Sequence, residues 1–143
     1  MIFLKTYFKP QNIRLVLGII ALSLTFVACE DDSVTSGDLR EEYIGQWTCH
    51  EVSQQYGESD YFVSITKGED EDHINIFNFY NLGETESLSV FIEDNDLTIS
   101  SQSIKGNNIS GSGNSNIGFT NINFTYNVFD GAETDQVTAE YNR

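Results

Sequence analysis

Basic residues are scarce in this sequence of 143 residues, which holds 7 lysines and arginines against 22 aspartates and glutamates. The formal net charge is −15, and three of the seven basic residues (Lys5, Lys9 and Arg14) lie in the first 28 residues, which contain no acid. The rest of the chain therefore carries a balance of −18. A surface this acidic repels phosphate backbones, which excludes nucleic acid as an ordinary partner and disfavours adsorption to anionic membranes through charge.

Residues that carry chemistry are also few. The two histidines, His50 and His73, have no third ligand motif nearby, so they do not indicate a zinc site. The acidic runs at residues 69–72 and 93–96 lack the spacing of a calcium loop, and we interpret them as solvated turns. Residues 106–113 have the outer glycines of a phosphate loop without its lysine. We expect no metal, no cofactor and no enzymatic activity.

There are two cysteines, Cys29 and Cys49, and one proline, Pro10. If Cys29 is modified, as argued below, Cys49 has no partner for an intramolecular disulfide. We expect Cys49 to be a small buried residue of a strand. His50 would then point to the opposite face, which excludes a regular Cys–His pair. No proline is available after residue 10 to interrupt a strand ladder.

Long apolar runs are absent apart from one near the N-terminus. Residues 1–14 are basic, and residues 15–28 form an uncharged, largely apolar run. As a helix this run would span about 21 Å, less than the ~30 Å of a hydrocarbon core. The pattern is typical of an export signal, and we predict a signal peptide at residues 1–28. The alternative is a membrane anchor helix that remains in the mature protein.

The end of the apolar run, Phe26-Val27-Ala28-Cys29, resembles the lipobox of bacterial lipoproteins, with Phe26 where leucine is usual. The resemblance implies that Cys29 becomes the lipidated first residue, and acyl chains at ~0.8 kcal/mol per buried CH₂ would anchor it. The acids after Cys29 resemble the export signal that sends Bacteroidetes lipoproteins to the cell surface. The next residues, with Ser33, resemble the O-glycosylation motif of that phylum. These resemblances imply a protein attached to the outer membrane by covalent lipid, with residues 29–38 as an acidic tether.

Residues 39–143 alternate apolar and polar side chains with the period of half-buried strands, most clearly at residues 122–128. Residues 73–80 change phase between Ile76 and Phe77, which a bulge or burial on both faces would explain. Short polar connections that contain Gly, Asn or Asp predict hairpin turns. They lie at residues 57–59, 67–72, 81–85, 93–95, 105–107 and 130–134.

These segments amount to about eight strands joined in order by tight turns. Closing such a meander protects both of its edges, so we predict one small up-and-down antiparallel β-barrel at residues 39–143. A two-sheet sandwich is the alternative. The expected sixth strand, residues 109–113, has almost no side-chain bulk. Its glycines suit a sharp bend or a close approach of another backbone.

Gly45-Gln46-Trp47, at the start of the first strand, resembles the Gly-x-Trp signature of lipocalins and the wider calycin group. Residues 96–113 and 138–143 are similar to small lipocalin-like lipoproteins of Bacteroidetes. The resemblance covers most of residues 40–143 and implies an up-and-down barrel with Trp47 packed across one end. Gly45 and Trp47 would then be structural residues, and Trp47 would not bind ligand.

The barrel pattern and the missing catalytic groups favour a non-catalytic binding module for a small apolar ligand, a glycan or a protein. The alternative is a surface interaction or assembly component of the outer membrane without a ligand pocket. Three aromatic residues off the inward phase, Phe62, Phe91 and Phe119, are candidates for a stacking surface or for covering a barrel end. The sequence leaves open the ligand, a cavity, the oligomeric state, the membrane leaflet and the glycosylation of Ser33.

Overall fold

A computed structural model describes residues 37–143, which belong to one compact unit, Ser36–Arg143. The expected signal peptide, Cys29, Ser33 and most of the tether lie outside the described residues. Within residues 37–143 there is no helix long and apolar enough to cross a membrane.

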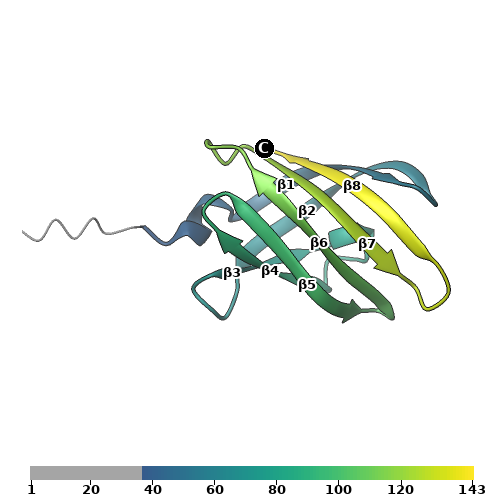
Figure 1. Ribbon diagram of the computed structural model, residues 1–143. Coiled ribbons are helices and arrows are strands. Elements are labelled where there is room, and N and C mark those ends of the chain that lie inside the picture. The colour runs from purple at the N-terminus through teal and green to yellow at the C-terminus, as the bar shows by residue number, and fades with distance from the viewer. Residues whose placement is uncertain (1–36) are drawn as a thin grey trace, which may run out of the picture. The chain divides into compact units, whose positions relative to one another are not determined.

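The described residues form a closed barrel of eight antiparallel strands, each hydrogen-bonded to the strand before and after it (Figure 1). The strands are β1 (Gly45–Ser53), β2 (Gly57–Lys67), β3 (His73–Phe77), β4 (Ser87–Glu93), β5 (Asp96–Ile104), β6 (Asn107–Ser115), β7 (Asn121–Phe129) and β8 (Thr134–Asn142). The ladder between β1 and β8 closes the sheet on itself, with Thr48 opposite Asn142. The predicted up-and-down barrel is confirmed, and the sandwich alternative is wrong. Because the unit has its own core and no open sheet edge, we expect it to fold by itself.

The two-residue alternation of the sequence sets which side chains fill the barrel. In β7, the side chains of Ile122, Phe124, Tyr126 and Val128 are buried, and the residues between them face outward. The other positions predicted for the buried face behave in the same way, apart from Tyr61, which is half-buried. The buried ones are Val63, Ile65, Leu88, Val90, Ile92, Leu97, Ile99, Val137, Ala139 and Tyr141. Removing this apolar surface from water stabilises the barrel.

The first hairpin turn lies earlier than predicted. Residues 57–59 are the first residues of β2 and pair with the end of β1, so the turn is formed by residues 54–56. The hydroxyl of Ser53 accepts hydrogen bonds from the backbone N–H groups of Gln55, at 3.1 Å, and Tyr56, at 2.8 Å. A serine side chain therefore satisfies the backbone of this turn, a role that it often takes in place of a backbone acceptor.

The phase change after Ile76 is not a bulge. Strand β3 ends at Phe77, and Asn78 adopts a left-handed conformation with φ 60° and ψ 26°. This reversal begins a short 3₁₀ turn, η2 (Phe79–Asn81), which returns the side chain of Phe79 to the interior. The prediction of a bulge or of two buried faces is therefore wrong, because the chain leaves the sheet at this point.

The glycines of β6 allow a close approach to β7. A Cβ atom on Gly111 would lie 2.4 Å from the carbonyl oxygen of Thr125, and one on Gly113 would lie 2.4 Å from Cδ1 of Phe124. Real Cβ atoms do not approach other atoms so closely, so only glycine fits here without displacing β7. Of the two explanations given above, close approach is the one that the structure supports.

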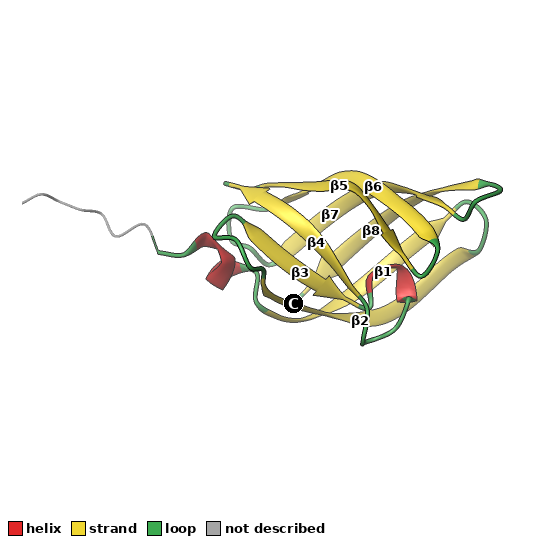
Figure 2. Ribbon diagram, turned by 90° about the horizontal axis from the view of Figure 1, so that it is seen from below, coloured by secondary structure: helices red, strands yellow, loops and turns green. Residues whose placement is uncertain are grey.

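The two ends of the barrel are covered differently, by the two short helical segments drawn in red in Figure 2. One end lies next to η1 (Leu39–Glu42). There Trp47 is buried, and its Nε1 donates to the carbonyl oxygen of Tyr43 at 2.9 Å. The guanidinium of Arg143 lies 4.4 Å from the centroid of the Trp47 ring. We call this the Trp47 end. The opposite end, where η2 and the first hairpin turn lie, is the η2 end.

Candidate functional site

The interior of the barrel becomes polar toward the η2 end. Along β1 the inward-facing residues run Trp47, Cys49, Glu51 and Ser53, so the last two place a carboxylate and a hydroxyl inside. Strand β8 adds Asp135 at the same end. Glu51 is only 4% exposed and Asp135 only 2%. Carboxylates are rarely buried to this degree, because removing a charge from water is costly.

Glu51 belongs to a cluster with three tyrosines, Tyr61 of β2, Tyr126 of β7 and Tyr141 of β8. We call these four residues the tyrosine–carboxylate cluster. The hydroxyls of Tyr61 and Tyr126 both donate to the same atom, Oε2 of Glu51. Among the side-chain hydrogen bonds of the described residues none uses Oε1, which leaves that oxygen available to a further donor. Ala139 lies opposite Glu51 in the neighbouring strand.

Burial and hydrogen bonding act on Glu51 in opposite directions. Burial raises the pKa of the Glu51 carboxyl, the hydroxyls of Tyr126 and Tyr61 lower it in part, and the charge of Asp135 raises it again. The net direction is upward, so the charged form is disfavoured relative to water. The same burial raises the pKa of Tyr61 and of Tyr126 well above the ordinary value, so both hydroxyls remain donors.

Tyr141 is the fourth member of the cluster. Its side chain is fully buried, and its hydroxyl is the buried side-chain oxygen in residues 37–143 that has no hydrogen-bond partner. Cys49 lies opposite both Tyr141 and Tyr61 in the two neighbouring strands. Burial raises the pKa of the Cys49 thiol to about 12, so the thiol is neutral and a weak partner for the hydroxyl. An unmade hydrogen bond of this kind costs roughly 1–3 kcal/mol.

The charge of the cluster is not balanced inside the barrel. None of the ion pairs formed by the described residues includes Glu51 or Asp135. The hydroxyls of Tyr61 and Tyr126 donate to Glu51 instead. No basic side chain of residues 37–143 therefore pairs with either interior carboxyl group.

Asp135 connects η2 to the barrel wall. Its Oδ2 accepts from the hydroxyl of Ser53 at 2.6 Å and from the hydroxyl of Tyr80 at 2.7 Å, and its Oδ1 accepts from the backbone N–H of Gln55 at 3.1 Å. Tyr80 belongs to η2, whereas the other donors belong to the first hairpin and its turn. We call the Tyr80–Asp135 hydrogen bond the latch, because it joins the covering segment to the barrel.

The segment that carries the latch is strained. Asn78, Tyr80 and Asn81 all have positive φ, at 60°, 53° and 52°. Asparagine tolerates this conformation, but for tyrosine it costs of the order of 1 kcal/mol or more. Between them, Phe79 fills the interior, with its ring centroid 4.6 Å from that of Tyr126. Three left-handed residues among four indicate a segment that is held in place by its contacts.

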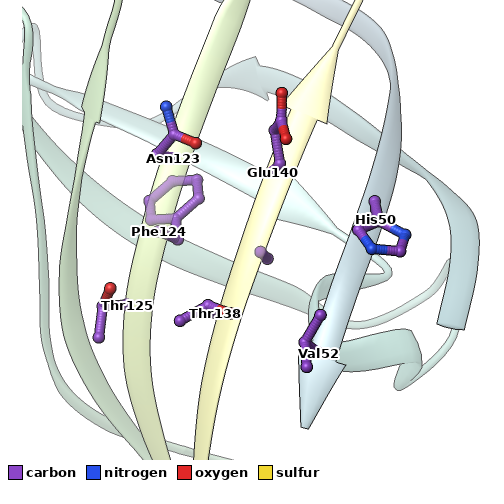
Figure 3. Close-up of a pocket in the computed structure, with 8 residues that line it drawn as sticks. His50, Val52, Asn123, Phe124, Thr125, Thr138 and Glu140 are labelled. Atoms are coloured by element: carbon purple, nitrogen blue, oxygen red, sulfur yellow. The ribbon is translucent and has the colours of Figure 1, made fainter. Parts of the chain in front are cut away.

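The outer wall of the barrel has open hollows. The one in Figure 3 lies across β1, β7 and β8, and polar or exposed side chains surround it, among them His50, Asn123 and Glu140. His50 Nδ1 is 2.8 Å from Oδ1 of Asp60, and this contact raises the pKa of His50. No aromatic face is exposed in this groove, because Phe124 is buried beneath it. The groove therefore lacks the stacking platform that binding of a sugar ring would need.

The three aromatic candidates from the sequence lie in three different environments. Phe119 packs edge-on against Tyr43 at 5.2 Å and helps to cover the Trp47 end. Phe91 packs against the ring of His73 at 5.6 Å. Phe62 is 60% exposed and borders a hollow with Phe77 and other residues of β2 and β3. They do not form one stacking surface.

The acidic run at residues 69–72 lies in a turn, as the sequence suggested, whereas in the run at 93–96 only the two middle residues form the turn and the outer two end β4 and begin β5. Asp70, Asp72 and His73 bring one ligand atom each to within 4.8 Å of one another, but both aspartates are exposed. The His73 ring bonds Asp72 at 2.6 Å, and the backbone oxygen of Asp70 accepts from Arg40 at 2.8 Å. Calcium needs six or more oxygen ligands, and no further carboxylate joins this group among the described residues.

The sequence reasoning missed the tyrosine–carboxylate cluster, although a signal for it was present. In the alternation that begins at Trp47, Glu51 has the parity of the buried face, and a charged residue at such a position is exceptional. Asp135 likewise stands at a position of β8 whose side chain faces inward. Of the predicted site residues, Gly45 opens β1 with φ 128°, Trp47 is buried two residues later, and Cys29 lies outside the described part of the chain.

Comparison with known proteins supports the fold and does not identify a family. No protein-family model matches the chain. No curated protein matches it either. Among solved structures, the chain is similar to a redesigned β-barrel, with 11% sequence identity, a TM-score of 0.51, and coverage of 73% of this chain and 93% of that one. At this identity the likeness shows a small closed barrel and nothing about function.

Proposed function

We propose that this protein is a lipid-anchored protein of the cell envelope whose barrel is a non-catalytic binding module. The ligand would lie inside the barrel at the η2 end. The anchoring part of this proposal is supported by the sequence around Cys29 alone. The binding part is supported by the barrel fold and by the tyrosine–carboxylate cluster.

One observation carries the binding proposal: a buried carboxylate and an unpartnered tyrosine hydroxyl lie under a strained covering segment. Burying Glu51 without a cation and Tyr141 without a partner lowers stability. An apolar interior would be more stable, so these groups are better explained by contacts that a ligand completes. Polar groups that converge in a mostly apolar barrel are typical of small-molecule sites.

The barrel as described is the closed form of such a site. An eight-stranded barrel is just wide enough to be filled by side chains or to hold one small ligand. Here Phe79 fills the space beside Tyr126 and Phe124, at ring distances of 4.6 Å and 6.0 Å. A ligand would therefore enter when η2 moves outward, and it would take the place of Phe79.

Native mass spectrometry tests the binding proposal. The full chain is released from the membranes of its own cells with a mild detergent and examined for a bound small molecule. We expect one mass adduct in the natural protein and in Tyr56→Phe, which removes an exposed hydroxyl, and a weaker adduct in Tyr126→Phe, which removes a buried one. An adduct that is retained equally by both variants would place the ligand outside the barrel, and the proposal would be wrong.

The anchor has its own test. Replacing Cys29 by serine removes the thiol that would be acylated, so the protein should move from the detergent phase to the aqueous phase when cells are fractionated. Cys49→Ser is the matched control, because it removes the other thiol of the chain and leaves Cys29 unchanged. A Cys29→Ser protein that stays in the detergent phase would show that the chain is held by something other than lipid on this residue.

A surface interaction or assembly role in the outer membrane is the second candidate. It is favoured by Phe62, whose large apolar ring is 60% exposed beside a hollow lined by Phe77. Crosslinking in intact cells should then recover the same neighbouring protein repeatedly from the natural chain and much less of it from Phe62→Ser. A reproducible neighbour that does not depend on Phe62, or no neighbour at all, would count against this role.

A further inference from the structure

Inside the barrel, a group of aromatic rings lies next to the carboxyl group of Glu51. Tyr126 joins the two, because its ring packs against Phe79 and its hydroxyl donates to Glu51. When η2 moves out, the volume that Phe79 occupies becomes free beside the ring of Tyr126. The hydroxyl at the tip of that ring donates to Glu51. A ligand in this place would therefore have an apolar body beside the Tyr126 ring and, close to it, a group that suits Glu51.

The electrostatics at that point select a cation. Glu51 is surrounded by tyrosines and has no basic partner among the described residues, and Asp135 adds a second negative charge from the next strand. Tyr61 and Tyr126 both donate to Oε2, so Oε1 can accept from a new donor. An anion would meet two carboxylates in a medium of low dielectric constant, which excludes it.

The hydroxyl of Tyr141 is a second indication. It is completely buried, it has no hydrogen bond to an oxygen or nitrogen atom, and it faces the thiol of Cys49, which is a weak partner. A hydroxyl can accept a hydrogen bond as well as donate one, whereas a carboxylate can only accept. An ammonium group carries three donors, so it could satisfy Oε1 of Glu51 and the oxygen of Tyr141 together.

We infer that the ligand of this barrel is an organic amine with a small apolar body, bound as its ammonium form. The body takes the place of the Phe79 ring, and the ammonium lies among Glu51, Tyr61, Tyr126 and Tyr141. An inorganic cation does not fit this arrangement as well, because hard metal ions require more oxygen ligands than the cluster offers. This inference rests on the proposed function, since it names the ligand class of the same interior site.

Three probes of nearly equal size test the inference: 2-phenylethylamine, which is charged at neutral pH, the neutral 2-phenylethanol, and the anion 3-phenylpropanoate. Each is titrated into the unit Ser36–Arg143 and followed by calorimetry at physiological salt, which screens the acidic outer surface. Fluorescence of the buried Trp47 confirms that every variant is folded. We expect the amine to bind at least about tenfold more tightly than the alcohol, and the anion not to bind.

Two isosteric variants locate the charge that is recognised. Glu51→Gln keeps an acceptor for the tyrosines but removes the charge. It should lower the affinity for the amine at least about tenfold and change the affinity for the alcohol by no more than about twofold. Glu140→Gln removes an exposed charge from the outer face of β8 and should change neither affinity. Equal losses in the two variants would mean that the amine is attracted by surface charge only, and the inference would be overturned.

The remaining outcomes separate the inference from the proposed function. If the alcohol binds as tightly as the amine, the ligand class is wrong and the interior site stands. If no probe binds, the titrations are repeated with Tyr80→Phe, which removes the latch and should open the site. Binding of the amine to Tyr80→Phe and not to the natural chain supports the inference and shows that the latch keeps η2 closed. Absence of binding by all three probes there would overturn both the inference and the proposed interior site.

Discussion

The latch between Tyr80 and Asp135 should control how often η2 leaves the barrel. Tyr80→Phe removes the hydroxyl that donates to Oδ2 of Asp135 at 2.7 Å and leaves the ring in place. Asp135 keeps its bonds from Ser53 and from the N–H of Gln55, so no buried charge is left without a partner. The substitution therefore weakens the attachment of η2 without disrupting the wall beneath it.

The size of the effect follows from the kind of hydrogen bond that is lost. A hydrogen bond to a charged acceptor contributes roughly 1.5–3 kcal/mol, and the partial exposure of Tyr80 suggests about 2 kcal/mol here. A change of about 2 kcal/mol raises the equilibrium constant for local opening about 30-fold. The left-handed backbone of Asn78, Tyr80 and Asn81 favours the same direction, because its strain is released when the segment leaves.

Native-state hydrogen exchange measures this opening directly. The N–H of Leu82 donates to the carbonyl oxygen of Phe79 at 3.2 Å, and the N–H of Asn81 donates to that of Asn78 at 3.1 Å, so both amides report on η2. In Tyr80→Phe they should exchange about 30-fold faster, while the amides in the β7–β8 ladder change little. Tyr56→Phe is the control, because Tyr56 is 74% exposed.

Two results would refute this reasoning. Unchanged exchange at Leu82 and Asn81 would mean that the latch does not hold η2. Equal acceleration of η2 and of the β7–β8 ladder would mean that the unit opens only as a whole. In the second case η2 is part of the core and not a cover, and the ligand would have no route into the barrel.

Three further predictions concern the interior. The pKa of Glu51 is raised in the folded state, so the stability of the natural chain should fall as pH rises from the pKa of the unfolded chain through the raised pKa. In urea unfolding, Glu51→Gln should therefore gain stability over the natural chain between about pH 4 and about pH 8. A stability difference that is the same at both pH values would contradict this. Cys49, with its buried thiol and a pKa of about 12, should react with maleimide only when the barrel opens; labelling in native buffer at the rate of a free thiol would exclude the burial described here. Gly111→Ala should lower the free energy of unfolding by about 1–3 kcal/mol, because its Cβ atom would clash with Thr125. Gly118 has open space around it, so Gly118→Ala should change the same free energy by less than about 0.5 kcal/mol. Equal losses in the two variants would show that β6 does not need the close approach.

The sheet itself was predictable because its signal is local. Alternation within each strand, as in Ile122, Phe124, Tyr126 and Val128, depends only on the chain direction and on which face meets the core. Closure was predictable as a way to protect edges, but its register was not. The pairing of Thr48 with Asn142 joins residues from the two ends of the unit, and no short segment of sequence specifies it.

The cover at the η2 end depends on single backbone angles that composition does not determine. Asn78 can continue a strand or turn left-handed, and the alternation before it is compatible with both. Tyr80 at positive φ runs against its own preference, so only the contacts of Phe79 and the latch explain it. The bulge that the sequence suggested was the simplest explanation for the change of phase, and the tertiary contacts selected a different one.

The cluster around Glu51 was hidden by the acidity of the chain. One carboxylate among 22 has little significance as a residue type, and its meaning comes from its parity within β1. Most of the other acids lie in turns or on outward faces, where they interact with water. Glu51 instead accepts from two tyrosines, beside a third tyrosine that has no partner. Because this arrangement lowers the stability of the barrel, the proposed bound cation is the simplest physical reason for a sequence to keep it.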